Sequence, residues 1–410
     1  MRAHMITEYT RMTDTFPAVV LKSKEEHRIR SGHCWVYSNE INTQRSPLKS
    51  FEAGEIVKIL TAKDQFLGYG YINPNTLLCV RIVSRNKKYG ITESVIKHHL
   101  QNALQMRELL YPSPFYRLVH GEGDFLPGLV IDRYGDFLVC QFNTAGMQGL
   151  KETIVEILTH LVKPKGILIR SDLNQRKIEG LEDDHEVIFG DIPDEAEVLT
   201  PNGTFLIPLK SGQKTGWFYD QTENRQQTVN ISKNKTALDL FSYVGSWGIG
   251  SAIAGAKSVV CVDSSQTALD YVEINAKRNN VADRVTTIKS DANTAAKQLI
   301  ADGDRFDLVM VDPPAFIKRK KDVKNGLEAY RRTNEIALRL TKQHGFFFSS
   351  SCSFHMPLDR FQLIIHQAAR HVDRQLQRVY QGQQDKDHPV HPAMPETNYL
   401  KHAMYHVNIS

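Results

Sequence analysis

Two residues in the last quarter of the chain, Cys352 and Asp312, have the types and settings that chemistry needs. Cys352 lies in the small polar run Ser-Ser-Cys-Ser (350–353), directly after an apolar segment. Asp312 begins the run Asp-Pro-Pro (312–314), whose prolines stiffen the turn and hold the carboxylate in place. A thiolate there would be a nucleophile, and the carboxylate would handle a proton or orient a partner. An inert thiol and a merely rigid turn are the alternatives.

A thiol in this position suits chemistry at carbon 5 of cytosine or uracil. Carbon 5 is a poor nucleophile until a thiolate adds at carbon 6, after which it can take a methyl group from a sulfonium donor. Removal of the carbon-5 proton and loss of the thiolate follow. Because the thiolate is the active form, Cys352 needs a lowered pKa or an adjacent base. Cys261, inside an apolar run, is expected to be a packed core thiol.

Three more acidic residues, Asp239, Asp263 and Asp291, stand at the ends of predicted strands. Asp239 begins a turn with two glycines (239–248), which let a ligand approach the backbone closely. Asp263 is placed to bind a ribose diol, and Asp291 to bind an adenine amino group. Each acid alone could instead be a helix N-cap, and the turn alone would also fit a nicotinamide dinucleotide. Together with the Asp-Pro-Pro turn, they favour a nucleoside cofactor that donates a methyl group.

The elements that must position these residues alternate between strands and helices from about residue 235. Strands separated by helices of 10–15 residues predict an α/β, Rossmann-like, doubly wound sheet, in which ligands bind beyond the carboxyl ends of the strands. The predicted strands are 237–240, 258–262, 285–289, 306–311 and 345–349, and the predicted helices are 248–254, 266–279, 292–301 and 326–341.

Two further domains are predicted before this one, which we place at 201–410. Residues 16–92 form a small, mostly β domain with strands at 18–21, 34–37, 55–60, 66–72 and 77–83. Residues 93–200 form a central α+β domain. It is entered through a helix over 91–110 with Thr92 as N-cap, and it combines strands at 129–131, 137–142 and 166–170 with a helix at 147–161.

The composition limits the partners, the cellular location and the metal or disulfide sites that we expect for this protein. The formal net charge is +5, and three basic clusters, at 22–30, 85–88 and 318–321, are either phosphate contacts or solvated faces. No apolar run is long enough for a membrane span or a secretory signal, so we expect a cytoplasmic protein without a membrane partner. The His-Pro-Val-His run (388–391) lacks a third metal ligand and predicts a proline-stiffened loop over 387–399. Five scattered cysteines indicate neither disulfides nor a metal site: Cys34, Cys79, Cys140, Cys261 and Cys352.

On these motifs the chain resembles the bacterial ribosomal RNA large subunit methyltransferase I family, which makes 5-methylcytosine in 23S rRNA from S-adenosylmethionine. The likeness runs from about Phe16 to the C-terminus. Residues 32–41 are similar to the RNA-binding PUA domain of that family. Further matching segments are 121–128, 132–136, 223–225 and, most specifically, Gly-Gln-Lys-Thr-Gly-Trp-Phe-Tyr-Asp-Gln at 212–221.

The resemblance implies that Cys352 is the nucleophile, that the cofactor is S-adenosylmethionine and that 23S rRNA is the partner. The chain departs from the family at Ala315, where a lysine is common, and this is expected to shift a phosphate contact to Lys318 or its neighbours. It also departs at Phe354, which is expected to change the base pocket. The predicted cofactor contacts are Lys214, Thr215, Phe218, Asp220, Arg225, Asp239, Phe241, Tyr243, Gly245, Asp263, Asp291, Asp312 and Pro313.

Two other functions remain open at this stage. A guanine-modifying rRNA methyltransferase of the same fold would share the Gln-Lys-Thr-Gly segment, but it needs no nucleophilic cysteine. A non-catalytic RNA-binding factor could keep the cofactor fold, and the presence of both Asp312 and Cys352 argues against it. The sequence leaves the oligomeric state open, with a homodimer as one option.

Overall fold

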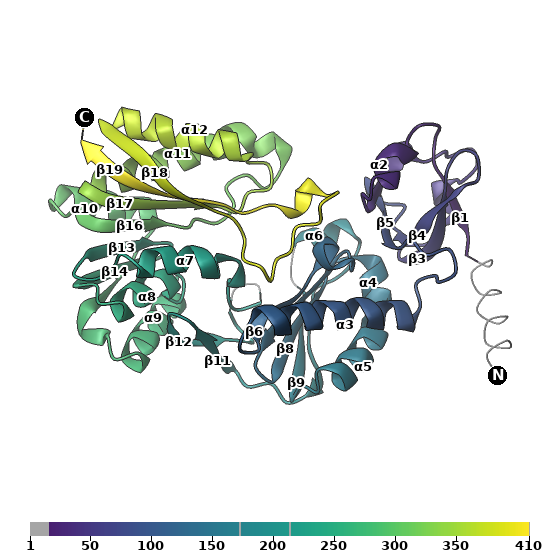
Figure 1. Cartoon of the computed structure of the whole chain (residues 1–410), viewed down its shortest axis with the longest axis horizontal. Coiled ribbons are helices and arrows are strands. Elements are labelled where there is room, and N and C mark those ends of the chain that lie inside the picture. Colours follow the sequence, from purple (N-terminus) through teal and green to yellow (C-terminus); the bar gives the residue numbers. More distant parts are fainter. Residues whose placement is uncertain (1–15, 172–173, 213–214, 410) are drawn as a thin grey trace. The chain divides into compact units, whose positions relative to one another are not determined.

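The computed structural model describes residues 16–171, 174–212 and 215–409 (Figure 1). The chain forms two compact units, and each is assembled from segments that are distant in sequence. Unit 1 contains Met1–Asp194, Ser211–Trp217 and Lys386–Thr397; unit 2 contains Glu195–Lys210, Phe218–Asp385 and Asn398–Ser410. Within the described residues, no helix is both long and apolar enough to cross a membrane.

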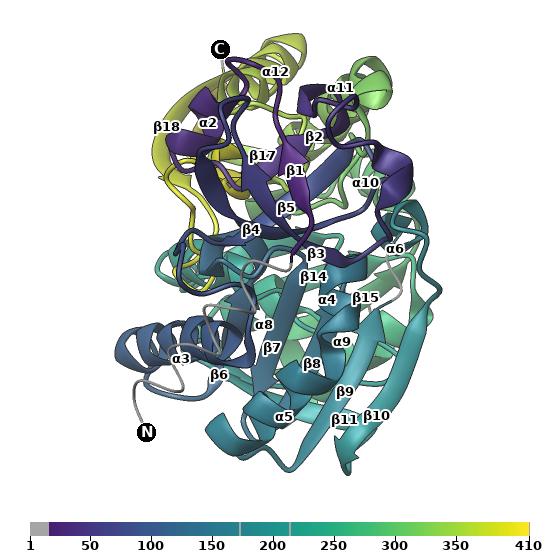
Figure 2. The same cartoon turned by 90° about the vertical axis from the view of Figure 1, so that its right-hand side faces the viewer.

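The first part of unit 1 is a five-stranded sheet with the order β1-β3-β4-β5-β2 (Figure 2). Its strands enclose a core of aliphatic side chains such as Val36, Val57 and Ile82. This confirms the predicted small β domain, with strand bounds that agree to within about one residue. The elements are β1 (Ala18–Val20), α2 (Glu26–Arg30), β2 (Trp35–Tyr37), β3 (Glu55–Leu60), β4 (Phe66–Ile72) and β5 (Leu78–Ser84).

The second part of unit 1 is a sheet with the order β10-β9-β8-β7-β6, covered by two helices. Helices α3 and α5 place apolar residues such as Leu100 and Ile154 against the sheet residues Ile131 and Ile169. An α+β arrangement is thus present. The elements are α3 (Glu93–Leu110), β6 (Phe115–His120), β7 (Leu129–Tyr134), β8 (Phe137–Phe142), α4 (Ala145–Gly149), α5 (Lys151–Leu161), β9 (Gly166–Ser171), α6 (Asn174–Ile178) and β10 (Asp184–Gly190).

One local expectation in this region was wrong. The helix expected over 147–161 is broken at Leu150 into α4 and α5. Gly149 directly precedes the break, and glycine is a weak helix former. The expected N-cap of α3 is confirmed as Thr92, whose hydroxyl pairs with the Ser94 hydroxyl and not with a main-chain N–H of the first turn.

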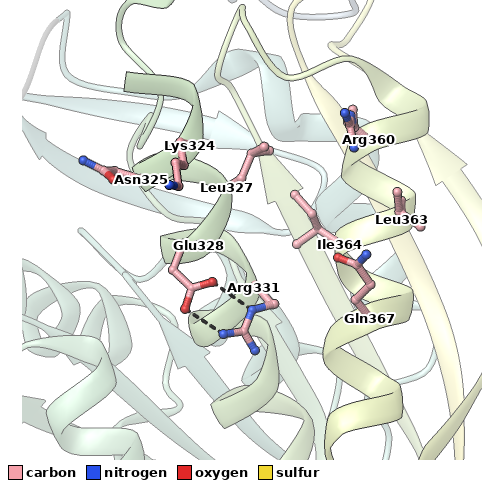
Figure 3. Close-up of a pocket in the computed structure, with 9 residues that line it drawn as sticks. All are labelled: Lys324, Asn325, Leu327, Glu328, Arg331, Arg360, Leu363, Ile364 and Gln367. Atoms are coloured by element: carbon pink, nitrogen blue, oxygen red, sulfur yellow. Dashed lines mark hydrogen bonds and ion pairs between the residues drawn. The ribbon is translucent and has the colours of Figure 1, made fainter. Parts of the chain in front are cut away.

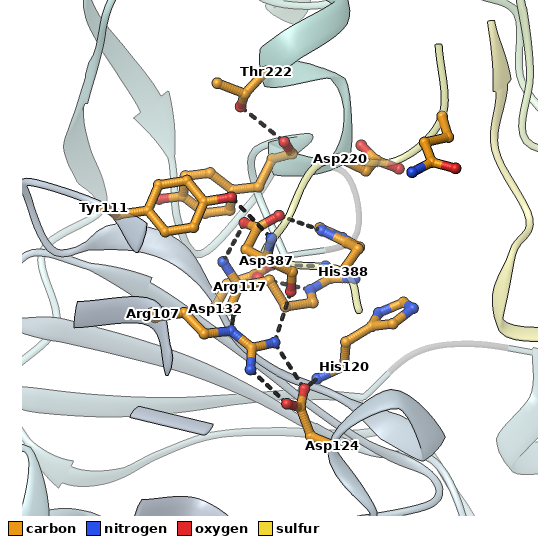
Figure 4. Close-up of polar contacts among 12 residues, drawn as sticks. Arg107, Tyr111, Arg117, His120, Asp124, Asp132, Asp220, Thr222, Asp387 and His388 are labelled. Carbon is orange, nitrogen blue, oxygen red and sulfur yellow. Dashed lines mark hydrogen bonds and ion pairs between the residues drawn. The ribbon is translucent and has the colours of Figure 1, made fainter. Parts of the chain in front are cut away.

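A buried polar network ties the segment Lys386–Thr397 into unit 1 (Figure 4). Arg107 is fully buried and donates to both carboxylate oxygens of Asp124 and, at 2.7 Å, to the main-chain oxygen of Asp387. The Asp387 carboxylate accepts from the Arg117 main-chain N–H at 2.8 Å and pairs with His388 at 2.6 Å. His388 is therefore held by a carboxylate, and no group of three metal-ligating side chains occurs in the described residues.

Unit 2 is built around a seven-stranded sheet with the order β15-β14-β13-β16-β17-β19-β18. Strands β13 to β17 pair in parallel, as expected for a Rossmann-like domain, whereas β19 runs antiparallel to both β17 and β18. The strands are β13 (Thr236–Leu240), β14 (Ser258–Asp263), β15 (Val285–Lys289), β16 (Phe306–Val311), β17 (Thr341–Ser351), β18 (Arg374–Gly382) and β19 (Lys401–Ile409).

Helices cover both faces of this sheet (Figure 1). The helices α7 (Thr222–Val229), α8 (Ser246–Ile253) and α9 (Gln266–Arg278) lie on one face. On the other face, α10 (Ala292–Ala301), α11 (Val323–Leu340) and α12 (Leu358–His371) pack into the main core of the unit.

A hairpin precedes this sheet. Its strands β11 (Glu195–Thr200) and β12 (Gly203–Pro208) pair antiparallel, and both belong to unit 2. The expected boundary between residues 200 and 201 falls in the turn of this hairpin. The three-domain division at 16–92, 93–200 and 201–410 stays a prediction, and the two structural units group these segments differently.

Candidate active site at the strand ends of unit 2

The turn after β13 has an unusual backbone. Phe241 (φ 66°), Tyr243 (φ 48°) and Gly245 (φ 85°) all adopt left-handed conformations. Such conformations cost free energy for residues other than glycine and cluster at ligand-binding sites. The main-chain N–H of Tyr243 donates to Asp263 Oδ2 at 2.9 Å, so the carboxylate at the end of β14 holds this turn in shape.

Asp239, near the end of β13, is almost completely buried. Its Oδ2 accepts from the Gly248 N–H at 2.9 Å, while its Oδ1 has no hydrogen-bond partner in the described part of the chain. Burial raises the pKa of Asp239 to about 7. A side chain at position 248 would clash with the Cys261 sulfur, which explains the glycine. An unsatisfied buried carboxylate oxygen indicates a place for a donor or a cation.

Asp312 follows β16 and is held by two donors. Gln221 Nε2 donates to its Oδ1 at 3.0 Å, and the Trp247 indole Nε1 donates to its Oδ2 at 3.2 Å. Burial, and next the negative charge of Asp220, raise the pKa of Asp312 to about 6, against the opposing effect of Arg225. The carboxylate can therefore gain or lose a proton close to neutral pH.

Asp220 forms an acidic cluster with Asp239 and Asp312, and Arg225 is the basic residue near it. Asp220 Oδ2 accepts from the Tyr399 hydroxyl at 2.6 Å, and its Oδ1 is buried without a partner among the described residues. The positive charge of Arg225 opposes, but does not cancel, the rise in the pKa of both Asp239 and Asp312. One guanidinium thus acts on two of the three carboxylates, and the cluster is suited to a cationic ligand.

Three other predicted cofactor residues belong to the same unit. The rings of Phe218 and Tyr243 meet edge to face, with centroids 5.6 Å apart. Pro313 is buried beside Asp312. Asp291 is exposed, and its Oδ1 accepts from the N–H groups of Asn293 and Thr294, so it is the N-cap of α10. Its contact with an adenine stays a prediction.

Two predicted cofactor residues are not part of this group. Thr215 is a buried residue of unit 1, where its carbonyl oxygen accepts from the Tyr134 hydroxyl at 3.1 Å. Lys214 lies outside the described residues. Their roles toward a cofactor stay predictions.

Cys352 directly follows β17 and is the one cysteine that is not buried in the described residues. Its neighbours fix the backbone around it. Ser353 Oγ accepts from the Ile317 N–H at 3.1 Å and lies 2.9 Å from the Tyr330 hydroxyl, to which Ser351 Oγ also donates. The Ser353–Ile317 bond joins the loop that carries Cys352 to the loop that carries Asp312.

Several site residues were missed by the sequence reasoning. Gln221 and Trp247 lie inside quoted motifs, but nothing in their spacing shows that both donate to Asp312. The Trp247 ring stacks on His402, with centroids 5.4 Å apart. His402 and its neighbour Lys401 come from β19 and carry no local signal, because that strand reaches β17 only through the antiparallel pairing at the end of the chain.

A groove between α11 and α12 is separate from this cluster (Figure 3). Leu327 and Ile364 form its floor, Lys324 and Arg360 flank it, and Arg331 in its wall is paired with Glu328. None of the predicted catalytic or cofactor residues lines this groove.

Comparisons with known proteins give the family. A model described as a PUA-like domain matches residues 19–85, and one described as Conserved hypothetical protein 95 matches residues 198–340. A solved structure of a putative methyltransferase complexed with SAH shares the fold, with a TM-score of 0.82 and 19% identity over 95% of this chain and 100% of that one.

Two curated relatives are similar over almost their whole length. The ribosomal RNA large subunit methyltransferase I of Aliivibrio fischeri is 32% identical over 94% of this chain and 98% of that protein. The enzyme of the same name from Klebsiella pneumoniae is 31% identical over 95% of this chain and 98% of that protein. The chain therefore belongs to the ribosomal RNA large subunit methyltransferase I family.

Proposed function

We propose that this protein transfers a methyl group from S-adenosylmethionine to carbon 5 of a cytosine in 23S rRNA through a covalent adduct of Cys352. One observation carries the proposal. The accessible thiol at the end of β17 and the carboxylate at the end of β16 lie on loops joined by the Ser353–Ile317 hydrogen bond. A nucleophile and a proton-handling group are thus held on adjacent strand ends, where doubly wound sheets bind their ligands.

The acidic cluster fits the proposed cofactor. The unpartnered Oδ1 atoms of Asp220 and Asp239 offer acceptors for the amino group of the cofactor, and its sulfonium adds a second positive charge to an acidic surrounding. Asp263 would bind the ribose hydroxyls, and the strained turn 241–245 brings main chain close to the ligand. When bound, S-adenosylmethionine supplies an electrophilic methyl group.

The side chains of the protein perform the remaining chemistry. The Cys352 thiolate adds to carbon 6 of the base, and the electron pair released onto carbon 5 makes that carbon nucleophilic. After carbon 5 is methylated, its proton leaves to a base, and the electrons of that C–H bond expel the thiolate. Asp312, with a pKa of about 6, is suited to orient the base or pass on this proton near neutral pH.

The RNA target rests on the relatives and on the PUA-like domain. Both curated relatives are named for ribosomal RNA of the large subunit. In the PUA-like domain, Arg28 pairs with Glu40, and Arg85 donates to main-chain oxygens, so these two cations hold the fold. Lys24 and Lys88 are exposed and are the better candidates for phosphate contacts.

The test is the identity of the methylated nucleoside. Purified protein is incubated with unmodified 23S rRNA and S-adenosylmethionine carrying a labelled methyl group, and the RNA is digested and analysed by mass spectrometry. We expect labelled 5-methylcytidine. A labelled methylguanosine would overturn the proposal in favour of the guanine-modifying alternative. RNA binding without any label in an enzyme that binds the cofactor would favour a non-catalytic factor.

A further inference from the structure

Lys401 is a buried lysine beside the candidate nucleophile. In the antiparallel pairing of β17 with β19, Lys401 lies opposite Ser351, the residue before Cys352. Its ammonium donates to the main-chain oxygen of Ser353, the residue after Cys352, at 2.6 Å, and to that of Tyr399 at 2.7 Å. The lysine is thus fixed to the backbone on both sides of the cysteine.

The Lys401 ammonium lacks an ordinary counter-ion. The residue is only 6% exposed. Among the described residues, its ammonium contacts two main-chain oxygens and no carboxylate. Burying an unpaired charge is costly, and two carbonyl dipoles offset this cost only in part. Burial lowers the pKa of Lys401 to about 8, and the negative charge of Cys352 opposes this effect.

A second titratable side chain near Cys352 has a different role. The Tyr330 hydroxyl, from α11, interacts with the hydroxyls of Ser351 and Ser353. Burial raises the pKa of Tyr330, and the charge of Cys352 raises it further. Tyr330 therefore stays neutral near pH 7 and holds the loop, whereas Lys401 brings a positive charge.

We propose that Lys401 is a positioning residue that holds Cys352 as a thiolate, with the Ser353 and Tyr399 carbonyls fixing the ammonium beside the sulfur. The inference rests on the proposed function, because the nucleophilic role proposed for Cys352 requires its thiolate form. The pairing favours both groups: the thiolate supplies a counter-ion for the buried Lys401 ammonium, and the ammonium favours the ionised form of the half-buried thiol. Removing the lysine charge should therefore make the thiol less ionised at neutral pH.

The test measures the thiol directly, without RNA or methyl transfer. The rate of alkylation of the full-length protein by iodoacetamide is followed from pH 5 to 10, with Cys352→Ala as the baseline for the four buried cysteines. We expect the wild-type midpoint to lie below ~8.5, the ordinary cysteine value. Lys401→Gln, which can still donate to the carbonyls, should alkylate more slowly at pH 7, by about 10-fold for each pH unit by which its midpoint rises, and equally fast at pH 10. Lys401→Arg should restore most of the rate.

Each result decides the proposal. A wild-type midpoint at or above the ordinary value overturns it, and this measurement needs no variant that must fold. An unchanged profile in a folded Lys401→Gln protein, checked by thermal unfolding, overturns it as well. The proposed function fails separately: if Cys352→Ala still methylates rRNA, the thiolate is not the nucleophile, whatever its pKa.

Discussion

The Trp247 indole donates a hydrogen bond to the Asp312 carboxylate at 3.2 Å, while its ring stacks on the buried imidazole of His402. One side chain of α8 thereby contacts the residue that follows β16 and a residue of β19. The contact favours the ionised form of Asp312, since a hydrogen bond to a carboxylate stabilises its charge.

Replacing the Trp247 donor should shift the pH below which kcat/KM for RNA methylation falls. The pKa of Asp312 is already raised to about 6, so activity that needs the carboxylate is present above that pH and lost below it. Trp247→Phe keeps an aromatic ring but loses the N–H, so the pKa should rise further and the fall in kcat/KM should move to higher pH. The measurement is kcat/KM for RNA methylation against pH. An unchanged pH profile with normal stability would show that Asp312 does not control the rate.

Asp239 should limit the stability of the cofactor-free protein at high pH. Its folded pKa, about 7, is above its unfolded value, so its contribution to stability is fully present below about pH 4 and is lost as the pH rises toward 7. Asp239→Asn keeps an acceptor for Gly248 and avoids the buried charge. We expect the variant to be more stable than wild type at pH 8, by about 1–4 kcal/mol, but not at pH 4. Its affinity for S-adenosylmethionine should fall. Denaturant unfolding and calorimetry check both, and an equal pH dependence of the two proteins would contradict the prediction.

Asp263, the last residue of β14, and Asp291, which follows β15, should differ in how they affect stability and cofactor binding. Asp263→Ala should weaken S-adenosylmethionine binding by roughly 1–3 kcal/mol, because hydrogen-bonding groups of the ligand and of Tyr243 lose their partner. Asp291→Ala should cost about 1 kcal/mol of stability as a lost N-cap. Asp291→Ser, another good cap, should restore that stability but not the cofactor affinity. If calorimetry shows that Asp291→Ser binds S-adenosylmethionine as tightly as wild type does, then Asp291 acts only as the N-cap of α10.

The buried network of unit 1 should be far more sensitive than a surface ion pair. Arg107→Met leaves the carboxylate of Asp124 buried without its guanidinium and removes the donor to Asp387. We expect a loss of about 3–5 kcal/mol in the free energy of unfolding, and faster proteolysis within 386–397. Arg45→Ala, which breaks the exposed pair with Asp64, is the matched control and should cost no more than about 1 kcal/mol. Equal effects of the two substitutions would contradict the assignment.

Cys352 should form a covalent adduct with its RNA. With 5-fluorocytosine at the target position, the carbon-5 proton that must leave is absent, so the adduct should persist through denaturation and be seen as a shifted protein band. Cys352→Ala should form no adduct and lose methylation while still binding cofactor. Cys261→Ala is the control: its sulfur is buried in β14, so the substitution should affect packing and leave the adduct intact. Near-normal turnover by Cys352→Ala would exclude the mechanism.

The amino-acid sequence by itself determined the local elements and the residues at their ends. Hydrophobic periodicity identified β13 to β17 and the intervening helices. Short apolar runs are typical of buried strands, and apolar residues three or four positions apart are typical of helices. The acids and glycines of the turns were visible for the same reason, and so was Cys352 after its apolar strand. The break at Leu150 was missed because the apolar spacing continues across it.

Tertiary structure alone decided which distant residues meet. Lys401 flanks Cys352 because β19 inserts antiparallel beside β17, and Arg107 holds Asp387 across 280 positions of sequence. Both arrangements come from strand pairing and burial between remote segments, and neither leaves a local pattern in the chain. The direction of each pKa shift follows from the same burial, so the electrostatics of Asp239, Asp312 and Lys401 could not be deduced from their neighbours in sequence.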